Sequence, residues 1–282
     1  MEMTAERLVA TVGELPPVPD VAAKVMRMIS DPDVSAKALQ DVIMTDPSMT
    51  VNILKIANSA LFGVKREVKT LTHAIMLMGF SAIRGVVLAL ATKKIFDRSQ
   101  GFKHQLLWKN AISAASVSRF IAEQLIDHSK EEAFISGLLH NIGRVVMLKK
   151  FGDEYGELME RAYNDGAELN ELELQKYGFS HSEVNYFILE KWNLHENMVN
   201  ASRYYWQPEK APDFCAKLAA VVGISVQFNA SQGVGIYREG ESKFEPSENY
   251  LQVLGCSPEQ MNSVLALLWE KLATDQEMLS GL

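Results

Sequence analysis

The stretch AFISGLLHNIGRVVML, residues 133–148, is the most informative part of this chain. Apolar residues fill it almost all round a helical wheel, so it predicts a buried helix with one polar interruption at His140-Asn141. A histidine followed at once by an acid in such a helix would indicate a metal site, but here the second residue is asparagine. On residue type and spacing, a lone buried histidine is more often a hydrogen-bonded core residue than a metal ligand, and both interpretations remain open.

Helical signals continue on both sides of this stretch. Several polar residues stand directly before apolar runs with helical spacing, where their side chains can cap a first turn. They are Ser35, Asp46, Thr70 and Ser180. Two long helices are predicted over residues 82–96 and 102–126, and no segment alternates convincingly between apolar and polar residues. We therefore expect an all-α fold with many helices.

The charge is unevenly distributed along the chain. Residues 1–100 hold 12 Lys+Arg and 10 Asp+Glu, whereas the remainder holds 16 and 25. This difference suits two helical subdomains. We predict an N-terminal subdomain over residues 1–101, a helical core over residues 102–230, and a loop followed by a C-terminal helix over residues 231–282.

The composition argues against several classes of function. A net charge of −7 offers no basic excess for binding nucleic acid or an anionic membrane surface. Only two cysteines occur, without zinc-site spacing, and the N-terminus lacks the apolar run of a signal peptide. No uncharged apolar run approaches the roughly 18 residues that span a bilayer. We expect a soluble cytoplasmic protein with no nucleic-acid or membrane partner.

The six histidines form no HxxxH or HExxH pair, so a metal site would have to be assembled from distant helices. Four of them stand in polar or capping surroundings and are interpreted as structural or surface residues. These four are His73, His104, His128 and His195.

Three stretches of the chain carry a resemblance to a known family. They are residues 15–63, which end in DPSMTVNILKIANSALFG, then LTHAIMLMGFSAIRGVVLALA at 71–91, and GLLHNIGR at 137–144. In this order they resemble the HDOD family, the "HD-related output domain" branch of the HD phosphohydrolase superfamily, from about residue 15 to about residue 230. The resemblance implies a multi-helix fold with an N-terminal helical subdomain packed on a degenerate HD core.

The resemblance also implies where a metal site would lie. Catalytic HD enzymes bind one or two divalent metals through an early His, a His-Asp pair, further His residues and a late Asp, and the metals activate a water that attacks a phosphoester. In this chain the matching positions hold Asn110, His140, Asn141, His181, Tyr205, Trp206 and Val226. Two imidazoles remain and every carboxylate is missing, so we expect no bound metal and no cofactor.

The remaining polar residues of this site suggest a binding pocket. His140, Arg144 and His181 are predicted to form an anion-binding pocket floored by Tyr205 and Trp206. The alternative is that these side chains only pack and hydrogen-bond within the core.

Two other segments carry alternatives. Lys65, Arg66 and Lys69 form a small basic loop near a group of methionines, which indicates either a protein-binding surface or a solvated turn. The acidic stretch 152–175 is interpreted as a solvated helix face.

The function that follows from the resemblance is a non-catalytic regulatory module. It would act in trans on a signalling protein, through protein contacts or by binding a small anionic ligand. The alternative is a metal-dependent phosphohydrolase with an atypical ligand set.

Overall fold

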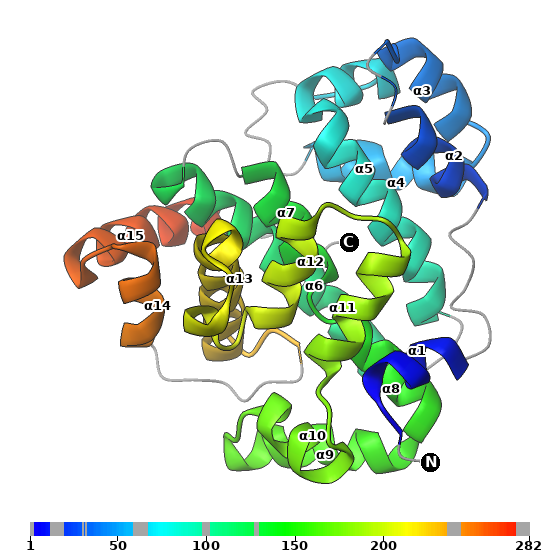
Figure 1. Cartoon of the computed structure of the whole chain (residues 1–282). Coiled ribbons are helices and arrows are strands. Elements are labelled where there is room, and N and C mark those ends of the chain that lie inside the picture. The colour runs from blue at the N-terminus through cyan, green and yellow to red at the C-terminus, as the bar shows by residue number, and fades with distance from the viewer. Residues whose placement is uncertain are drawn as a thin grey trace. The chain divides into compact units, whose positions relative to one another are not determined.

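The structure is a computed structural model that describes residues 3–11, 20–29, 31, 33–58, 67–97, 102–126, 130–235 and 244–274 (Figure 1). These residues form helices joined by turns, and no β-strand occurs among them. The expected all-α fold is therefore confirmed. The chain divides into two compact units, a large unit of residues 1–15 and 96–265 and a small unit of residues 16–95 and 266–282.

The small unit contains four helices in its described part. They are α2 (Asp20–Ile29), α3 (Ala36–Ile43), α4 (Pro47–Asn58) and α5 (Leu71–Asp97), which is interrupted by non-helical backbone at Gly79.

Local caps start these helices as predicted. Ser35 Oγ accepts a hydrogen bond from Ala38 N over 3.1 Å, and Asp46 Oδ1 accepts one from Met49 N over 3.1 Å. Such bonds satisfy backbone donors that have no partner within the helix.

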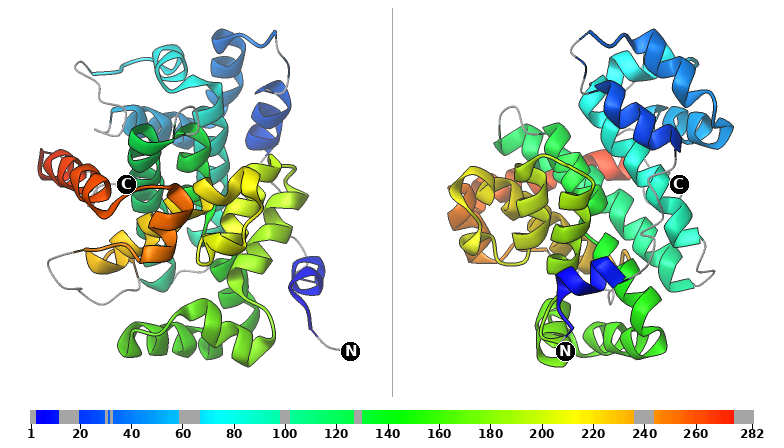
Figure 2. Two further views of the ribbon diagram at one scale, coloured as in Figure 1. Left: turned by 60° about the vertical axis from the view of Figure 1, so that its left-hand side comes forward. Right: turned by 45° about the vertical axis from the view of Figure 1, so that its right-hand side comes forward.

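The large unit holds the remaining helices. They are α1 (Ala5–Thr11), α6 (Phe102–Leu125), α7 (Lys130–Leu139), α8 (Ile142–Phe151), α9 (Asp153–Asp165), α10 (Leu169–Tyr177), α11 (His181–Lys191), α12 (Glu196–Tyr204), η2 (Pro208–Lys210), α13 (Asp213–Ser231), α14 (Glu248–Leu254) and the first half of α15 (Pro258–Thr274), whose second half belongs to the small unit. In Figures 1 and 2, α9 and α10 lie together at one end of this unit.

The helices α6, α7 and α13 form the centre of the large unit. A Cβ atom added to Gly137 of α7 would lie 2.7 Å from Ala114 O of α6, so only glycine permits this close approach. Polar side chains link α6 to α13 inside the core, with Ser118 Oγ 2.9 Å from Ser225 Oγ.

The prediction of one continuous helix over residues 133–148 is wrong in one respect. The chain forms two helices, α7 and α8, and His140 and Asn141 lie at the break between them. Asn141 begins the turn, and its carbonyl accepts the Arg144 N–H over 3.0 Å. The helix α8 then packs so closely on α11 that a Cβ atom on Gly143 would lie 2.1 Å from His181 O. The polar interruption is thus the place where the chain changes helix.

One helix among the described residues, α13, is long and apolar enough to cross a membrane by length and composition, and 67% of that apolar window is buried inside the protein. Such burial is typical of a core helix. The predicted basic loop lies mostly outside the described residues, which include neither Lys65 nor Arg66. Its third member, Lys69, is exposed, and its Nζ lies 3.5 Å from Glu67 Oε2. His128 also lies outside the described residues.

Candidate functional site

The large unit contains all seven positions that the resemblance singled out. Asn110 comes from α6, His140 and Asn141 from the α7–α8 break, His181 from the first turn of α11, Tyr205 and Trp206 from the end of α12, and Val226 from α13. All are buried except Trp206, which is half-buried and packs with Tyr205 and Val226.

A buried hydrogen-bond network surrounds His181. Its Nδ1 and its backbone N–H each lie 2.7 Å from Glu173 Oε2, and the other carboxylate oxygen accepts the Tyr155 hydroxyl over 2.5 Å. On the opposite side of the ring, His181 Nε2 lies 3.1 Å from Arg144 Nε and 2.7 Å from the Tyr205 hydroxyl. Arg144 Nη2 also reaches that hydroxyl over 3.4 Å. The network joins a buried carboxylate to a buried guanidinium through one imidazole.

The donors of this network determine the protonation of His181. An Arg144 N–H and the Tyr205 O–H both point at Nε2, so this nitrogen must be the acceptor and Nδ1 must carry the proton donated to Glu173. Burial lowers the pKa of His181, and the charge of Arg144 lowers it further against the opposite effect of Glu173. Burial, followed by the Glu173 charge, raises the pKa of Tyr155 well above its ordinary value, so its hydroxyl remains a donor. The ring of His181 is therefore neutral between a carboxylate and a guanidinium.

Glu173 and Tyr155 belong to the acidic stretch 152–175, for which the sequence predicts a solvated helix face. That interpretation is wrong for these two residues, since both have no exposed surface. In α10, Glu173 occupies the same buried face as Leu169 and Leu172, at helical spacing from them. This spacing was the signal in the sequence, and the surrounding acids obscured it.

His140 has no charged hydrogen-bond partner. Its Nδ1 lies 2.6 Å from Gly137 O, so it donates there, and its Nε2 makes no hydrogen bond to any described residue. Its ring packs edge-on against Tyr205, with 5.6 Å between ring centroids. Burial, with the Arg144 charge as a second cause, lowers the pKa of His140 to about 3. The side chain is therefore a neutral core imidazole.

The two asparagines tie separate elements together. Asn141 Nδ2 donates to Leu107 O of α6 over 2.8 Å, and Asn110 Nδ2 donates to Val234 O beyond α13 over 3.0 Å. Within the described part of the chain, neither Oδ1 atom has a hydrogen-bond partner.

This donor set does not fit the divalent metal that the resemblance implies. The seven positions contain no carboxylate, and His181 Nε2 is already engaged by a guanidinium and a hydroxyl. A dication beside Arg144 would also meet a positive charge in a poorly solvated interior. Among the described residues, no group of three His, Cys, Asp or Glu side chains is close enough to hold a metal ion.

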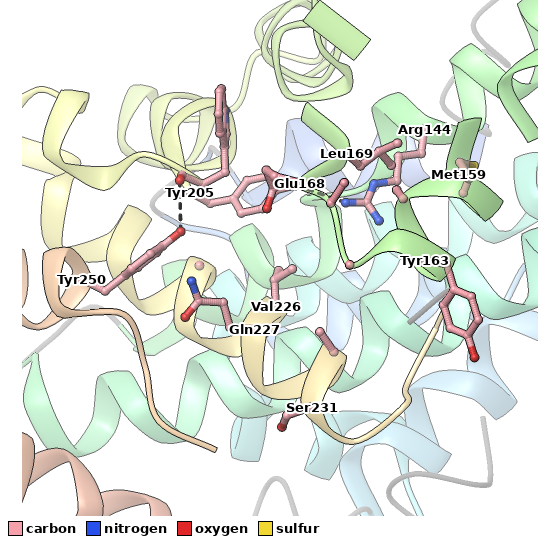
Figure 3. Close-up of a pocket in the computed structure, with 16 residues that line it drawn as sticks. Arg144, Met159, Tyr163, Glu168, Leu169, Tyr205, Val226, Gln227, Ser231 and Tyr250 are labelled. Atoms are coloured by element: carbon pink, nitrogen blue, oxygen red, sulfur yellow. Dashed lines mark hydrogen bonds between the residues drawn. The ribbon is translucent and has the colours of Figure 1, made fainter. Parts of the chain in front are cut away.

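A cavity of about 410 Å³ lies beside the network. Arg144, Tyr205, Trp206 and Val226 line it, as Figure 3 shows for the three of them that are labelled. Of the residues predicted to form a pocket, Arg144, Tyr205 and Trp206 line this cavity. His140 and His181 are fully buried and are not among the residues that line the cavity.

The fold and this site define an all-helical HD-type protein with a His-Asn pair at the break between two core helices. The chain belongs to the HDOD domain family, whose sequence model matches residues 15–208.

Similar sequences and structures come from bacteria. The chain is 24% identical over 219 residues to an uncharacterized protein of Treponema pallidum (strain Nichols), covering 76% of this chain and 42% of that protein. It is 24% identical over 157 residues to the uncharacterized protein YuxH of Bacillus subtilis (strain 168), covering 53% of this chain and 38% of that protein. The chain therefore spans about two fifths of the length of the curated relatives that it matches.

Two solved structures share the fold. An HDOD domain protein of unknown function from Geobacter sulfurreducens has a TM-score of 0.77 at 21% identity, with 99% of each chain covered. A protein from Shewanella amazonensis SB2B that is provisionally named a phosphohydrolase has a TM-score of 0.72 at 22% identity, with 96% of each chain covered.

Proposed function

We propose that this chain is a non-catalytic regulatory module, which acts in the cytoplasm by binding a signalling protein or a small anionic ligand. The observation that carries this proposal is the engagement of His181 Nε2 by Arg144 and Tyr205. A histidine that ligates a metal offers this lone pair to the ion, and here two donors already share it.

The missing carboxylates support the same conclusion. A metal centre that hydrolyses phosphoesters needs anionic ligands to hold the ion and an accessible water to be activated. Glu173 is the carboxylate nearest in the network, but it accepts three hydrogen bonds behind His181 and is fully buried. It acts there as the carboxylate that orients an imidazole.

A metal-dependent phosphohydrolase remains the second candidate, because one observation favours it. His140 Nε2, Asn110 Oδ1 and Asn141 Oδ1 are buried acceptors without a hydrogen-bond partner among the described residues. Buried acceptors normally bind a donor, a water or an ion.

Elemental analysis and a hydrolysis assay separate the two candidates. The protein is purified without a metal-affinity step, and bis(p-nitrophenyl) phosphate is then offered with Mn²⁺. We expect less than stoichiometric metal and no turnover above that of free Mn²⁺. One ion per chain that is lost in His140→Ala, together with Mn²⁺-dependent turnover, would establish the phosphohydrolase instead.

A further inference from the structure

The cavity beside the buried network has a charged inner end and an aromatic wall. Its volume of about 410 Å³ lies within the roughly 300–1,000 Å³ typical of small-molecule pockets. We propose that it binds a small aromatic anion, whose anionic group meets Arg144 and whose ring lies against Tyr205, Trp206 and Tyr250. This inference rests on the proposed function, since it names the class of ligand that the regulatory module senses.

The charge of the inner end follows from the order of groups in the network. Arg144 lines the cavity and is 3% exposed, whereas its counter-charge, Glu173, lies on the far side of the His181 ring and does not line it. The cavity thus faces the positive end of a buried dipole. Glu168 also lines the cavity, but it is an exposed residue, and its Oε1 already accepts hydrogen bonds from the backbone N–H and the side-chain amide of Asn170. An anion is favoured at the inner end because the nearest buried charge is positive.

The wall favours a ring over a sugar or another polyol. Tyr205 and Tyr250 are 2% and 5% exposed. The Tyr205 hydroxyl bonds to His181 Nε2 over 2.7 Å, and the Tyr250 hydroxyl donates to the backbone carbonyl of Trp206 over 3.1 Å, so each ring is held in place. Aromatic rings pack well against one another in offset or edge-on arrangements. A Cβ atom on Gly223 would lie 2.2 Å from Tyr250 Cε1, so this glycine allows Tyr250 to lie tightly against α13.

Few polar groups of the cavity could form hydrogen bonds with the hydroxyl groups of a sugar-like ligand. Gln227 is the amide among the lining residues, and both ends of it contact Ser247, with Nε2 3.3 Å from Oγ and Oε1 3.4 Å from the backbone N. Figure 3 shows Gln227 and Val226 on one side of the cavity and Arg144 and Leu169 on another. Tyr163, Glu168 and Ser231 also line the cavity, and Ser231 Oγ is bonded to Phe228 O and to Gln232 Nε2. Besides these groups, the cavity offers one cation, aromatic faces and apolar side chains.

Isothermal titration calorimetry with two probes of one shape tests the proposal. We expect 2-naphthoate to bind the wild-type chain with a Kd below about 1 mM, at least about tenfold more tightly than uncharged 2-naphthamide. Ala162→Phe and Ala230→Phe fill the cavity from α9 and α13 without altering the buried network, and each should weaken 2-naphthoate at least about tenfold. Glu157→Phe, on the exposed face of α9, should bind like the wild type.

Three results would overturn the proposal. They are no binding of 2-naphthoate below about 1 mM, equal binding of the two probes, and unchanged binding by both cavity-filling variants. Should one filling variant not fold, the comparison of the two probes on the wild-type chain still decides. If the ligand proposal fails, the chain can still be a regulatory module that acts by protein contacts. Mn²⁺-dependent hydrolysis would instead reject the proposed function, whatever the two probes show.

Discussion

Arg144 donates its Nε–H to His181 Nε2 over 3.1 Å, and both side chains are buried in the large unit. A guanidinium thus lies at the imidazole nitrogen that faces away from Glu173, on the side where a ligating histidine would meet a metal. The positive charge of Arg144 therefore occupies the position next to this nitrogen.

Arg144→Met should destabilise the protein by about 3 kcal/mol, because the buried Glu173 carboxylate would lose the nearby cation that compensates its charge. Urea unfolding followed by circular dichroism measures the change. Arg161→Met is the control. It removes an arginine from the exposed face of α9, where Arg161 pairs with Asp165 over 3.4 Å, and its free energy of unfolding should stay within about 0.5 kcal/mol of the wild-type value. A loss below about 1 kcal/mol for Arg144→Met would show that Glu173 is compensated by other groups.

Acid should destabilise the fold through His140. Its pKa is about 3 in the folded chain, below the ordinary value of 6.5, so between these values the unfolded chain binds a proton that the folded chain does not. The free energy of unfolding therefore falls as pH falls from about 6.5 towards 3, by roughly 1.4 kcal/mol per pH unit for this group. The lowered pKa of His181 acts in the same direction.

Urea unfolding of His140→Gln between pH 7.5 and pH 4.5 checks this contribution. The variant should lose less stability on acidification than the wild type. His195→Asn is the control, because His195 is an exposed helix cap, and its acid response should match that of the wild type. Identical pH profiles for all three proteins would contradict the assignment.

Asn141→Asp should not create hydrolytic activity. The new carboxylate would face Leu107 O, which now accepts the Asn141 amide over 2.8 Å, and His181 Nε2 would still be engaged by Arg144. We expect a loss of about 2 kcal/mol in stability and no Mn²⁺-dependent turnover of bis(p-nitrophenyl) phosphate. Turnover above that of the wild type would mean that the site can still assemble around a metal.

Tyr155→Phe should lower the free energy of unfolding by about 1–3 kcal/mol, because it removes one of the three hydrogen-bond donors of the buried Glu173 carboxylate. Tyr186→Phe is the matched control. Its hydroxyl donates to Glu190 over 3.3 Å near the surface, where water can replace the bond. Thermal or urea unfolding compares the two variants, and equal effects would contradict the importance of the buried bond.

The basic loop is proposed as part of a partner surface. Charge reversal of Lys65, Arg66 and Lys69 to Glu should reduce capture of a partner from the native cell, since charged loops steer protein association. Reversal of three exposed lysines of the large unit serves as the control. These are Lys149, Lys150 and Lys191. Unchanged capture and salt sensitivity in the loop variant, or its failure to fold, would reject this surface.

The helices and their caps could be predicted from the sequence because they depend on near neighbours. Ser180 caps α11 as predicted, and it forms a capping box with Glu183 by bonds that span three residues. The buried polar pair His140-Asn141 was also recognisable, because it interrupts a long apolar run. The sequence did not show that this pair marks a break between two helices, because the break depends on how closely α8 packs on α11 at Gly143.

The site itself depends on tertiary packing. Glu173 stands among acids along the chain, and only the packing of α10 against α11 turns it inward to His181. Likewise, local sequence places Arg144 one turn after His140, but bonds spanning 37 and 61 residues direct it to His181 and Tyr205. Helical periodicity assigns a residue to a face of its helix, whereas the partner that this face meets is decided by long-range contacts that no local pattern encodes.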